Sequence, residues 1–195
     1  MSETAAWIDA CIGKGLAAFL KAKGFTKSAR TWHRQAGSSW QLVNLQASQG
    51  NSGQEGRFAL NLGVYHGDVE SRCGPVLKAK PKAHQVTHGA RLGSPDLQGD
   101  HWWSIRPDLA PASVADELVA LLERQGLPWL DAHLEPAVLA KSLAAQPSLQ
   151  SFSAALLAGD SQEALRRVEA AIEARPRGRA HFSQWALAAG LSLKP

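Results

Sequence analysis

The spacing of apolar residues changes twice along this chain, and no other feature of the sequence constrains the fold as strongly. From residue 4 to residue 23 the apolar side chains recur every three or four positions, as on one face of an amphipathic helix. Between residues 29 and 92 they recur at every second position, which is typical of half-buried β-strands. From residue 114 the helical spacing returns and continues to the end of the chain. The order of these patterns predicts an α+β protein.

The alternating region divides into four runs, separated by segments rich in turn-forming residues. The strands that we expect cover residues 29–35, 40–48, 57–66 and 85–92. Because the connections between the first three are short, these strands are expected to form an antiparallel meander. We therefore predict an antiparallel sheet of four to five strands that packs on the N-terminal helix and a later helix, with a flexible loop over residues 67–84.

Alternation also separates the two faces of the expected sheet. The face toward the N-terminal helix carries the apolar side chains Val43, Leu45, Ala47, Phe58, Leu60, Leu62, Val64, Val86, Ala90 and Leu92. The opposite face is richer in polar groups, and five of its residues form a candidate binding face: Asn44, Gln46, Asn61, Tyr65 and Arg91.

Amide and guanidinium groups hold their hydrogen-bond donors in fixed planes, so this face suits a peptide backbone or a carboxylate. Two purely structural explanations compete with a binding role. Antiparallel sheets often leave one face in solvent. Alternatively, the C-terminal helices cover the face, and its amides then form a buried and satisfied network.

Five further helices are expected after the sheet. They cover residues 114–125, 136–146, 149–158, 161–175 and 178–189. Ser113, Ser148 and Asp160 precede three of them as N-cap residues. Gly126 and Gly159 follow two of them as stops.

The charge of the chain is modest but unevenly placed. Lys and Arg number 21 against 17 Asp and Glu, which gives a net charge of +4, far below the basic load of a dedicated DNA-binding protein. The whole excess arises within residues 1–50, where a candidate basic patch comprises Lys14, Lys21, Lys23, Lys27, Arg30 and Arg34. A local patch of this kind favours an acidic protein partner, and nucleic acid is not expected as a partner.

Several classes of site are not expected. The two cysteines lie far apart, which indicates a reduced, cytoplasmic protein rather than a disulfide scaffold or a thiolate zinc site. The seven histidines form no recognised ligand set, so no metal is expected. Phosphate-loop, dinucleotide and nucleophile-elbow motifs are absent, so no cofactor and no catalytic residue is assigned. No apolar run is long enough to span a membrane.

Several short motifs follow one another in the first two thirds of the chain. They read TWHR at residues 31–34, VNLQAS at 43–48, RFALNLGVY at 57–65, RLG at 91–93 and LPWL at 127–130. In this order they resemble the bacterial family named domain of unknown function 4304, over about residues 5–131. The resemblance implies an α+β domain with an antiparallel sheet, and it implies no established activity.

The segment from residue 148 to residue 190 is similar to tetratricopeptide-type helical hairpins. It holds material for about one and a half repeats, whereas a free solenoid needs three or more. We therefore expect one α+β domain over residues 1–131 and a helical extension over residues 132–195 that docks on it.

Two functions from different classes are compatible with these patterns. The first is a non-enzymatic protein-binding module, by analogy with immunity proteins that neutralise toxins, whose partner would be an acidic toxin domain. The alternative is a small-molecule or nucleic-acid binder that uses the polar face of the sheet. An enzyme would need converging histidine and carboxylate groups in a pocket, and the sequence gives no motif for such a site.

Overall fold

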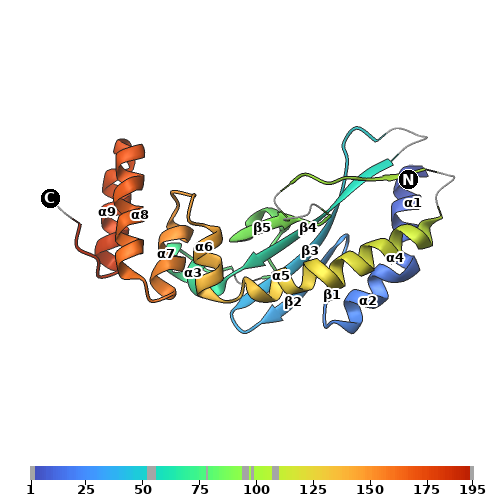
Figure 1. Cartoon of the computed structure of the whole chain (residues 1–195), viewed down its shortest axis with the longest axis horizontal. Helices are drawn as coiled ribbons and strands as arrows, with labels where there is room; N and C mark the ends of the chain where they lie inside the picture. The colour runs from blue at the N-terminus through green and yellow to red at the C-terminus, as the bar shows by residue number, and fades with distance from the viewer. Residues whose placement is uncertain are drawn as a thin grey trace.

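The computed structural model describes residues 3–51, 56–77, 79–93, 97, 99–106 and 110–193. Figure 1 shows a twisted antiparallel sheet with helices along one of its faces and the C-terminal helices gathered at one end. This arrangement confirms the predicted α+β class. In the described part of the chain, no helix is long and apolar enough to cross a membrane.

Within the described residues the sheet has six strands. They are β1 (Thr26–Ser28), β2 (Thr31–Ala36), β3 (Ser39–Ala47), β4 (Gly56–Tyr65), β5 (His88–Arg91) and β6 (Trp103–Ile105). Strands β1 to β5 follow one another in sheet order, and β6 also pairs with β4. Because Phe58 pairs with Ala47 of β3 and with Trp103 of β6, β6 lies on the same edge of β4 as β5. All four predicted strands are present, whereas β1 and β6 are too short to show an alternating pattern.

The pattern predicts one N-terminal helix over residues 4–23, and the structure divides it. Helix α1 (Glu3–Cys11) is joined to α2 (Ala17–Ala22) through the kinked segment Ile12–Leu16. Gly15 has a φ of 156°, outside the helical range, and this produces the kink. The apolar side of the segment stays in the core across the kink, where its buried residues are Ile8, Ile12, Leu16 and Leu20.

The helical region after the sheet corrects the predicted stop at Gly126. Helix α4 (Pro111–Leu121) continues through a π-helical turn (Leu122–Gly126) into α5 (Leu127–Ala132). A Cβ atom on Gly126 would lie 2.9 Å from the Leu122 side chain and 3.3 Å from that of Leu92. The glycine therefore lets the helix approach the sheet closely instead of ending it.

The start of α4 corrects a second prediction, the N-cap at Ser113. The helix begins at Pro111, and Ala110 occupies the N-cap position. The Ser113 hydroxyl donates a hydrogen bond to the Ala110 carbonyl at 2.8 Å. Proline suits the first position of a helix because its fixed φ is helical and its missing N–H would have no partner there, so the helix starts one turn earlier than the serine suggests.

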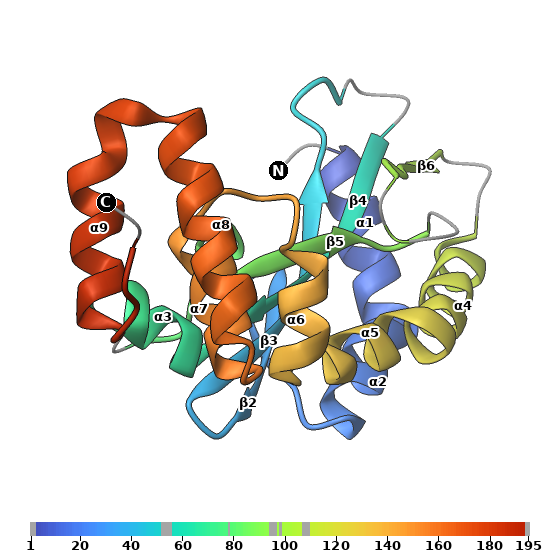
Figure 2. The ribbon, with the colours of Figure 1, turned by 60° about the vertical axis from the view of Figure 1, so that its left-hand side comes forward.

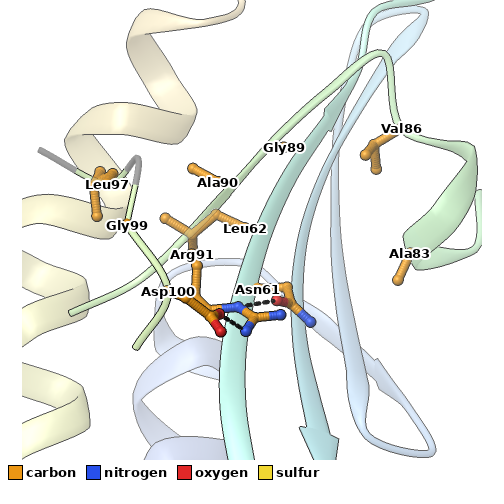
Figure 3. A pocket seen from close by; sticks show the side chains of 10 residues that line it. All are labelled: Asn61, Leu62, Ala83, Val86, Gly89, Ala90, Arg91, Leu97, Gly99 and Asp100. Carbon is orange, nitrogen blue, oxygen red and sulfur yellow. Dashed lines mark hydrogen bonds and ion pairs between the residues drawn. The ribbon is translucent and has the colours of Figure 1, made fainter. Parts of the chain in front are cut away.

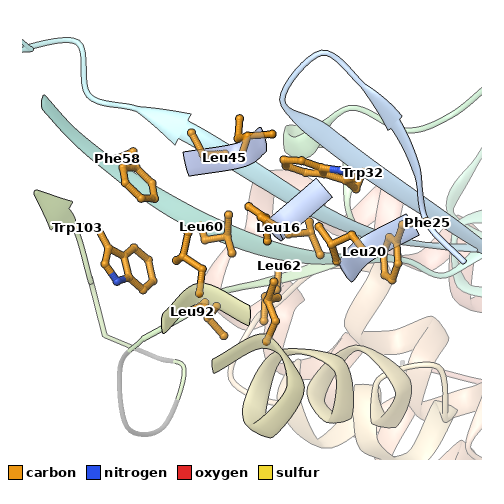
Figure 4. Close-up of a cluster of buried hydrophobic side chains, with 14 of the residues drawn as sticks. Leu16, Leu20, Phe25, Trp32, Leu45, Phe58, Leu60, Leu62, Leu92 and Trp103 are labelled. Atoms are coloured by element: carbon orange, nitrogen blue, oxygen red, sulfur yellow. The ribbon is translucent and has the colours of Figure 1, made fainter. Parts of the chain in front are cut away.

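The main hydrophobic core lies between the sheet and these helices (Figure 4). The predicted apolar face is confirmed at its centre, where Val43, Phe58, Leu60 and Leu92 are fully buried. Side chains from α1, α2, α4 and α5 pack onto this face, and Leu118, Leu122 and Leu130 are fully buried there. The other face of the sheet is therefore the one available for a site.

Helix α3 (Gly67–Cys73) lies within the segment 67–84, which the sequence predicts to be a loop. Its one buried apolar side chain, Val69, packs with Leu139, Leu143 and Ala154 from the C-terminal helices. A helix of seven residues with a single apolar anchor shows no periodic pattern, so its tertiary contacts decide its structure.

The C-terminal helices are α6 (Pro136–Ser142), α7 (Leu149–Leu157), α8 (Ser161–Ala174) and α9 (Arg179–Ala188). The predicted N-caps Ser148 and Asp160 are confirmed, because their side-chain oxygens accept hydrogen bonds from the N–H groups of Ser151 at 3.2 Å and Glu163 at 2.8 Å. Helix α7 packs on α3 (Figure 2). The Trp185 indole N–H of α9 donates to the Arg72 carbonyl of α3 at 2.7 Å. The domain boundary near residue 131 stays a prediction.

Truncation of one side chain on β4 tests this architecture. Leu60 is 0% exposed, so Leu60→Ala removes buried methyl groups and leaves a cavity. We expect the free energy of unfolding, measured by urea denaturation, to fall by about 2–5 kcal/mol. Leu187→Ala on α9, where the leucine is 78% exposed, is the matched control and should change it by less than about 0.5 kcal/mol. Equal effects of the two substitutions would contradict the position of Leu60 in the core.

Candidate functional site

The sheet face opposite the main core is divided into a covered half and an open half. The described residues between Gly74 and Thr87 cover the half that contains Tyr65, which is only 3% exposed. The Tyr65 hydroxyl accepts a hydrogen bond from the Leu77 N–H at 3.0 Å. Tyr65 therefore belongs to a buried contact of the fold, and the structure does not bring it together with the other four candidate residues.

Val86 takes part in this covering, which corrects its predicted place on the apolar face. A Cβ atom on Gly63 would lie 2.5 Å from the Val86 side chain, so Val86 packs directly over Gly63 on the second face. The error has a simple cause: β5 begins at His88, so the alternation of the strand does not extend back to Val86. Gly63 provides the space that the valine fills.

The rest of the covered half is also buried. His33 is 5% exposed, and its Nε2 is hydrogen bonded to the Pro81 carbonyl at 2.9 Å. Burial lowers the pKa of His33, and its neighbour Leu42 is 1% exposed. This half is therefore part of the folded interior, which leaves the open half as the candidate site.

We call the open half the open polar face, and it consists of Asn44, Gln46, Arg57, Asn61, Arg91, Asp100 and Trp102. Four of the five predicted candidate residues meet there. The Asn61 amide donates to Gln46 Oε1 at 3.0 Å and to Asn44 Oδ1 at 3.3 Å. The Arg91 Nε donates to Asn61 Oδ1 at 3.2 Å. These hydrogen bonds link the amide groups of β3 and β4 and the guanidinium group of β5 into one network.

Three residues of this face were not identified from the sequence. Asp100 forms an ion pair with Arg91 and accepts a hydrogen bond from the Trp102 indole N–H at 2.9 Å. The Trp102 ring lies 4.9 Å from the Arg91 guanidinium carbon and 5.8 Å from that of Arg57, both within cation–π range. The alternation of β4, which places Arg57 on the same face as Asn61, could have revealed Arg57, but no local pattern places the loop residues Asp100 and Trp102.

A cavity of about 390 Å³ lies beside Arg91 (Figure 3). Ala83 and Val86 border it on one side, and Leu97 and Asp100 border it on the other. Its volume lies within the range of small-ligand sites, about 300–1,000 Å³. The described residues that line it include none from α6 to α9, so the C-terminal helices do not cover this part of the sheet.

The C-terminal helices instead approach the covered half. Gln150 of α7 lines a second cavity, of about 280 Å³, together with Tyr65, Glu70 and His84. The explanation in which the C-terminal helices bury the amide network is therefore wrong for Asn44, Gln46 and Asn61, because the cover comes from residues between Gly74 and Thr87 and lies over the other half. The half near Tyr65 is enclosed, and the half around Asn61 and Arg91 is not.

The candidate basic patch is partly neutralised by acidic neighbours. Lys23 pairs with Glu123 at 3.3 Å, Arg30 pairs with Asp9 at 3.1 Å, and Arg34 pairs with Asp131. Lys21 is exposed, and Lys27 lies over the Trp32 ring at 5.6 Å. The Lys14 side chain lies outside the described part of the structure. The positive charge that is concentrated in this stretch of sequence is therefore much weaker on the folded surface.

Two histidines stack with a tryptophan where β5 meets α5. The ring centroids of His88 and His133 are 5.2 Å apart, and those of Trp129 and His133 are 4.0 Å apart. Burial, and to a lesser extent the neighbouring His133 ring, lowers the pKa of His88 to about 4. Burial also lowers the pKa of His133, which is hydrogen bonded to Trp129 and Ser142. These uncharged rings join the edge of the sheet to the helix.

The described residues give no indication of metal or thiol chemistry. Among them, no group of three or more His, Cys, Asp or Glu side chains is placed to hold a metal ion. Cys73 is half-buried, and burial raises the pKa of its thiol to about 11, which keeps it protonated at neutral pH. The open polar face is therefore the site on which a function can be argued.

An antiparallel sheet with helices on one face and a partly open polar surface on the other defines an α+β protein with a candidate binding face. More precisely, the chain belongs to the family described as Domain of unknown function (DUF4304), whose model matches residues 16–132. This match covers more than half of the chain, including every strand of the sheet. Comparison with curated proteins and with solved structures found no match for the chain.

Acid is expected to destabilise the folded chain through the stacked histidine His88. The pKa of His88 is about 4 in the folded chain and 6.5 as a free group, so as the pH falls the unfolded state takes up the proton first. The neutral His88 ring therefore contributes its full stabilisation of the folded state above pH 6.5, and this contribution is lost between pH 6.5 and 4. At pH 4.5 the loss in the free energy of unfolding is about 2 kcal/mol. Urea unfolding at pH 7.5 and 4.5 should show a larger loss for the wild type than for His88→Phe, which keeps a stacking ring. An identical loss in both proteins would contradict this account.

Proposed function

We propose that this chain is a non-enzymatic protein-binding module whose partner contacts the open polar face. The observation that carries the proposal is the placement of Trp102 within cation–π distance of both Arg57 and Arg91 on an uncovered part of the sheet. Tryptophan and arginine are among the side chains most enriched in residues that dominate binding energy at protein interfaces.

The hydrogen bonds around this group support the proposal. Asn61 and Asp100 hold the Arg91 guanidinium in place, and Asp100 also fixes the Trp102 indole. A side chain that is already held in its binding conformation loses less entropy when a partner docks. The face is therefore a preorganised surface rather than a set of mobile side chains.

The charges on this face favour an acidic partner. It carries two guanidinium groups, and the acidic group that the described residues place against them is Asp100, which pairs with Arg91. Arg57 is exposed and contacts the Trp102 ring. Because the basic patch is partly neutralised by Asp9, Glu123 and Asp131, the open polar face is the better candidate for contact with an acidic toxin domain. A toxin-neutralising immunity protein is the class of binding module that we propose.

Charge reversal distinguishes the two candidate surfaces. We expect a tagged wild-type chain, expressed in its native host, to retain one protein in stoichiometric amount. Arg57→Glu and Trp102→Ala should each weaken that complex at least about tenfold, because they remove an interface anchor. Lys21→Glu, an equal charge change on the basic patch, should leave the dissociation constant within about twofold. The measurement is titration calorimetry with the purified partner.

Two results would reject the proposal. One is the absence of a stoichiometric partner, and the other is a complex that depends on Lys21 and not on Arg57 or Trp102. If the captured protein is a toxin, cells that co-express it with the wild-type chain should survive, and cells that carry the Arg57→Glu chain should not.

The cavity beside Arg91 supports a second candidate function, a small-molecule binder that uses the same face. Its volume of about 390 Å³ and its Asn61 and Arg91 groups suit a ligand that bears a carboxylate. A panel of small carboxylic acids, tested by thermal shift, should contain a compound that binds saturably to the wild type. Arg91→Ala should abolish that binding, and Arg166→Ala on the exposed face of α8 should not. Binding that is unchanged in Arg91→Ala would exclude this function.

A further inference from the structure

The outer edge of β5 presents backbone hydrogen-bonding groups that are not used by the sheet. The Leu92 N–H donates to the Leu60 carbonyl at 2.9 Å. In an antiparallel ladder, alternate residues point their N–H and C=O groups toward the neighbouring strand. Ala90 therefore faces β4 like Leu92, and Gly89 and Arg91 direct their backbone groups outward. Among the described residues, no neighbouring strand pairs with this edge.

The cavity beside Arg91 runs along this edge. Gly89, Ala90 and Arg91 all line it, although alternation places Ala90 on the opposite face from its two neighbours. Three consecutive residues of a strand can border one cavity only where the cavity follows the edge of the strand. Gly89 is exposed, and it has no side chain that would obstruct an approaching backbone.

The two ends of this edge are bounded by other segments of the chain. Figure 3 shows Ala83 and Val86 toward the Gly89 end of the strand and Leu97, Gly99 and Asp100 toward its Arg91 end. The four residues of β5 span about 13 Å. An extended segment of four or five residues therefore fits the edge, whereas a helix or a folded loop does not match its pattern of donors and acceptors.

The side chains next to the edge define the charge of that segment. Side chains of an added strand that point to the open polar face would lie over Arg91 and toward Arg57 and Trp102. Carboxylates at these alternate positions would meet two guanidinium groups and one compensating acid, Asp100. Charge complementarity therefore favours an acidic extended segment.

We propose that an acidic, extended segment of a partner protein adds to β5 as a further strand, with backbone hydrogen bonds to Gly89 and Arg91 and carboxylates directed at Arg57 and Arg91. This inference rests on the proposed function for the statement that the partner is a protein, and it adds the mode of recognition. Main-chain hydrogen bonds would supply affinity, and the arginines would supply the preference for acidic side chains.

Gly89 allows a sharp test, because its N–H lies outside the ladder. Gly89→Pro removes the outward donor and removes no donor of the ladder between β5 and β4. Gly89→Ala is the matched control, because it adds a Cβ at 3.3 Å from the Leu62 carbonyl and 3.5 Å from Val86 but keeps the N–H. The probe is a set of peptides enriched on the full-length chain from a displayed library of random dodecapeptides.

We expect the enriched peptides to be rich in Asp and Glu and to bind Gly89→Pro at least about tenfold more weakly than wild type and Gly89→Ala. Because Gly89→Pro is able to disturb the strand, a second measurement uses the wild-type chain alone. N-methylation at every second residue of a peptide should abolish binding in one register and leave it nearly unchanged in the other. Hydrogen exchange at the Gly89 and Arg91 amides should slow when the peptide binds.

Failure of this inference is distinguishable from failure of the proposed function. If no acidic peptide is enriched, or if both N-methylation registers are tolerated, strand addition is wrong even when the host partner still depends on Trp102. Self-association through β5, detected by sedimentation and lost in Gly89→Pro, would assign the edge to a second copy and would also overturn the inference. If peptides bind as expected but no host protein is retained, strand addition stands and the proposed function falls.

Discussion

Every layer of this structure depends on the burial of β4. Its two edges are paired, with β3 along one and with β5 and β6 along the other. One of its faces carries the main core, and described residues between Gly74 and Thr87 cover part of the other. Of its ten residues, Arg57 alone is exposed and Asn61 alone is half-buried. The two positions of β4 that escape burial are therefore the two that contribute to the open polar face.

Much of the fold can be predicted because its longer elements satisfy local rules. Strands β3 and β4 alternate clearly, and Ser148 and Asp160 cap their helices as their residue types suggest. The exceptions are elements that only tertiary contacts explain. Helix α3 depends on Val69, and Gly126, which looks like a helix stop, instead lets the helix pass close to Leu92.

The candidate site shows the same division between local and tertiary information. Asn44, Gln46, Asn61 and Arg91 could be grouped from strand alternation alone, because neighbouring antiparallel strands bring them together. Tyr65 has the same alternation, but the chain around Leu77, which lies outside the strands of the sheet, covers it. Asp100 and Trp102 approach from a loop that has no periodic pattern. The net charge of the basic patch also cannot be predicted from local sequence, because the acidic residues that pair with Arg34 and Lys23 lie about one hundred positions away.

The position of α3 against the sheet depends on the absence of a side chain at Gly67. Helix α3 starts at Gly67, where a Cβ atom would lie 2.3 Å from the Ser38 carbonyl oxygen in the turn between β2 and β3. Helices α7 and α9 contact α3, and α6 and α8 pack on α7. A side chain at position 67 would have to push α3 off that turn, and the attached helices would move with it. The glycine therefore allows α3, together with the helices that pack on it, to lie directly against the turn between β2 and β3.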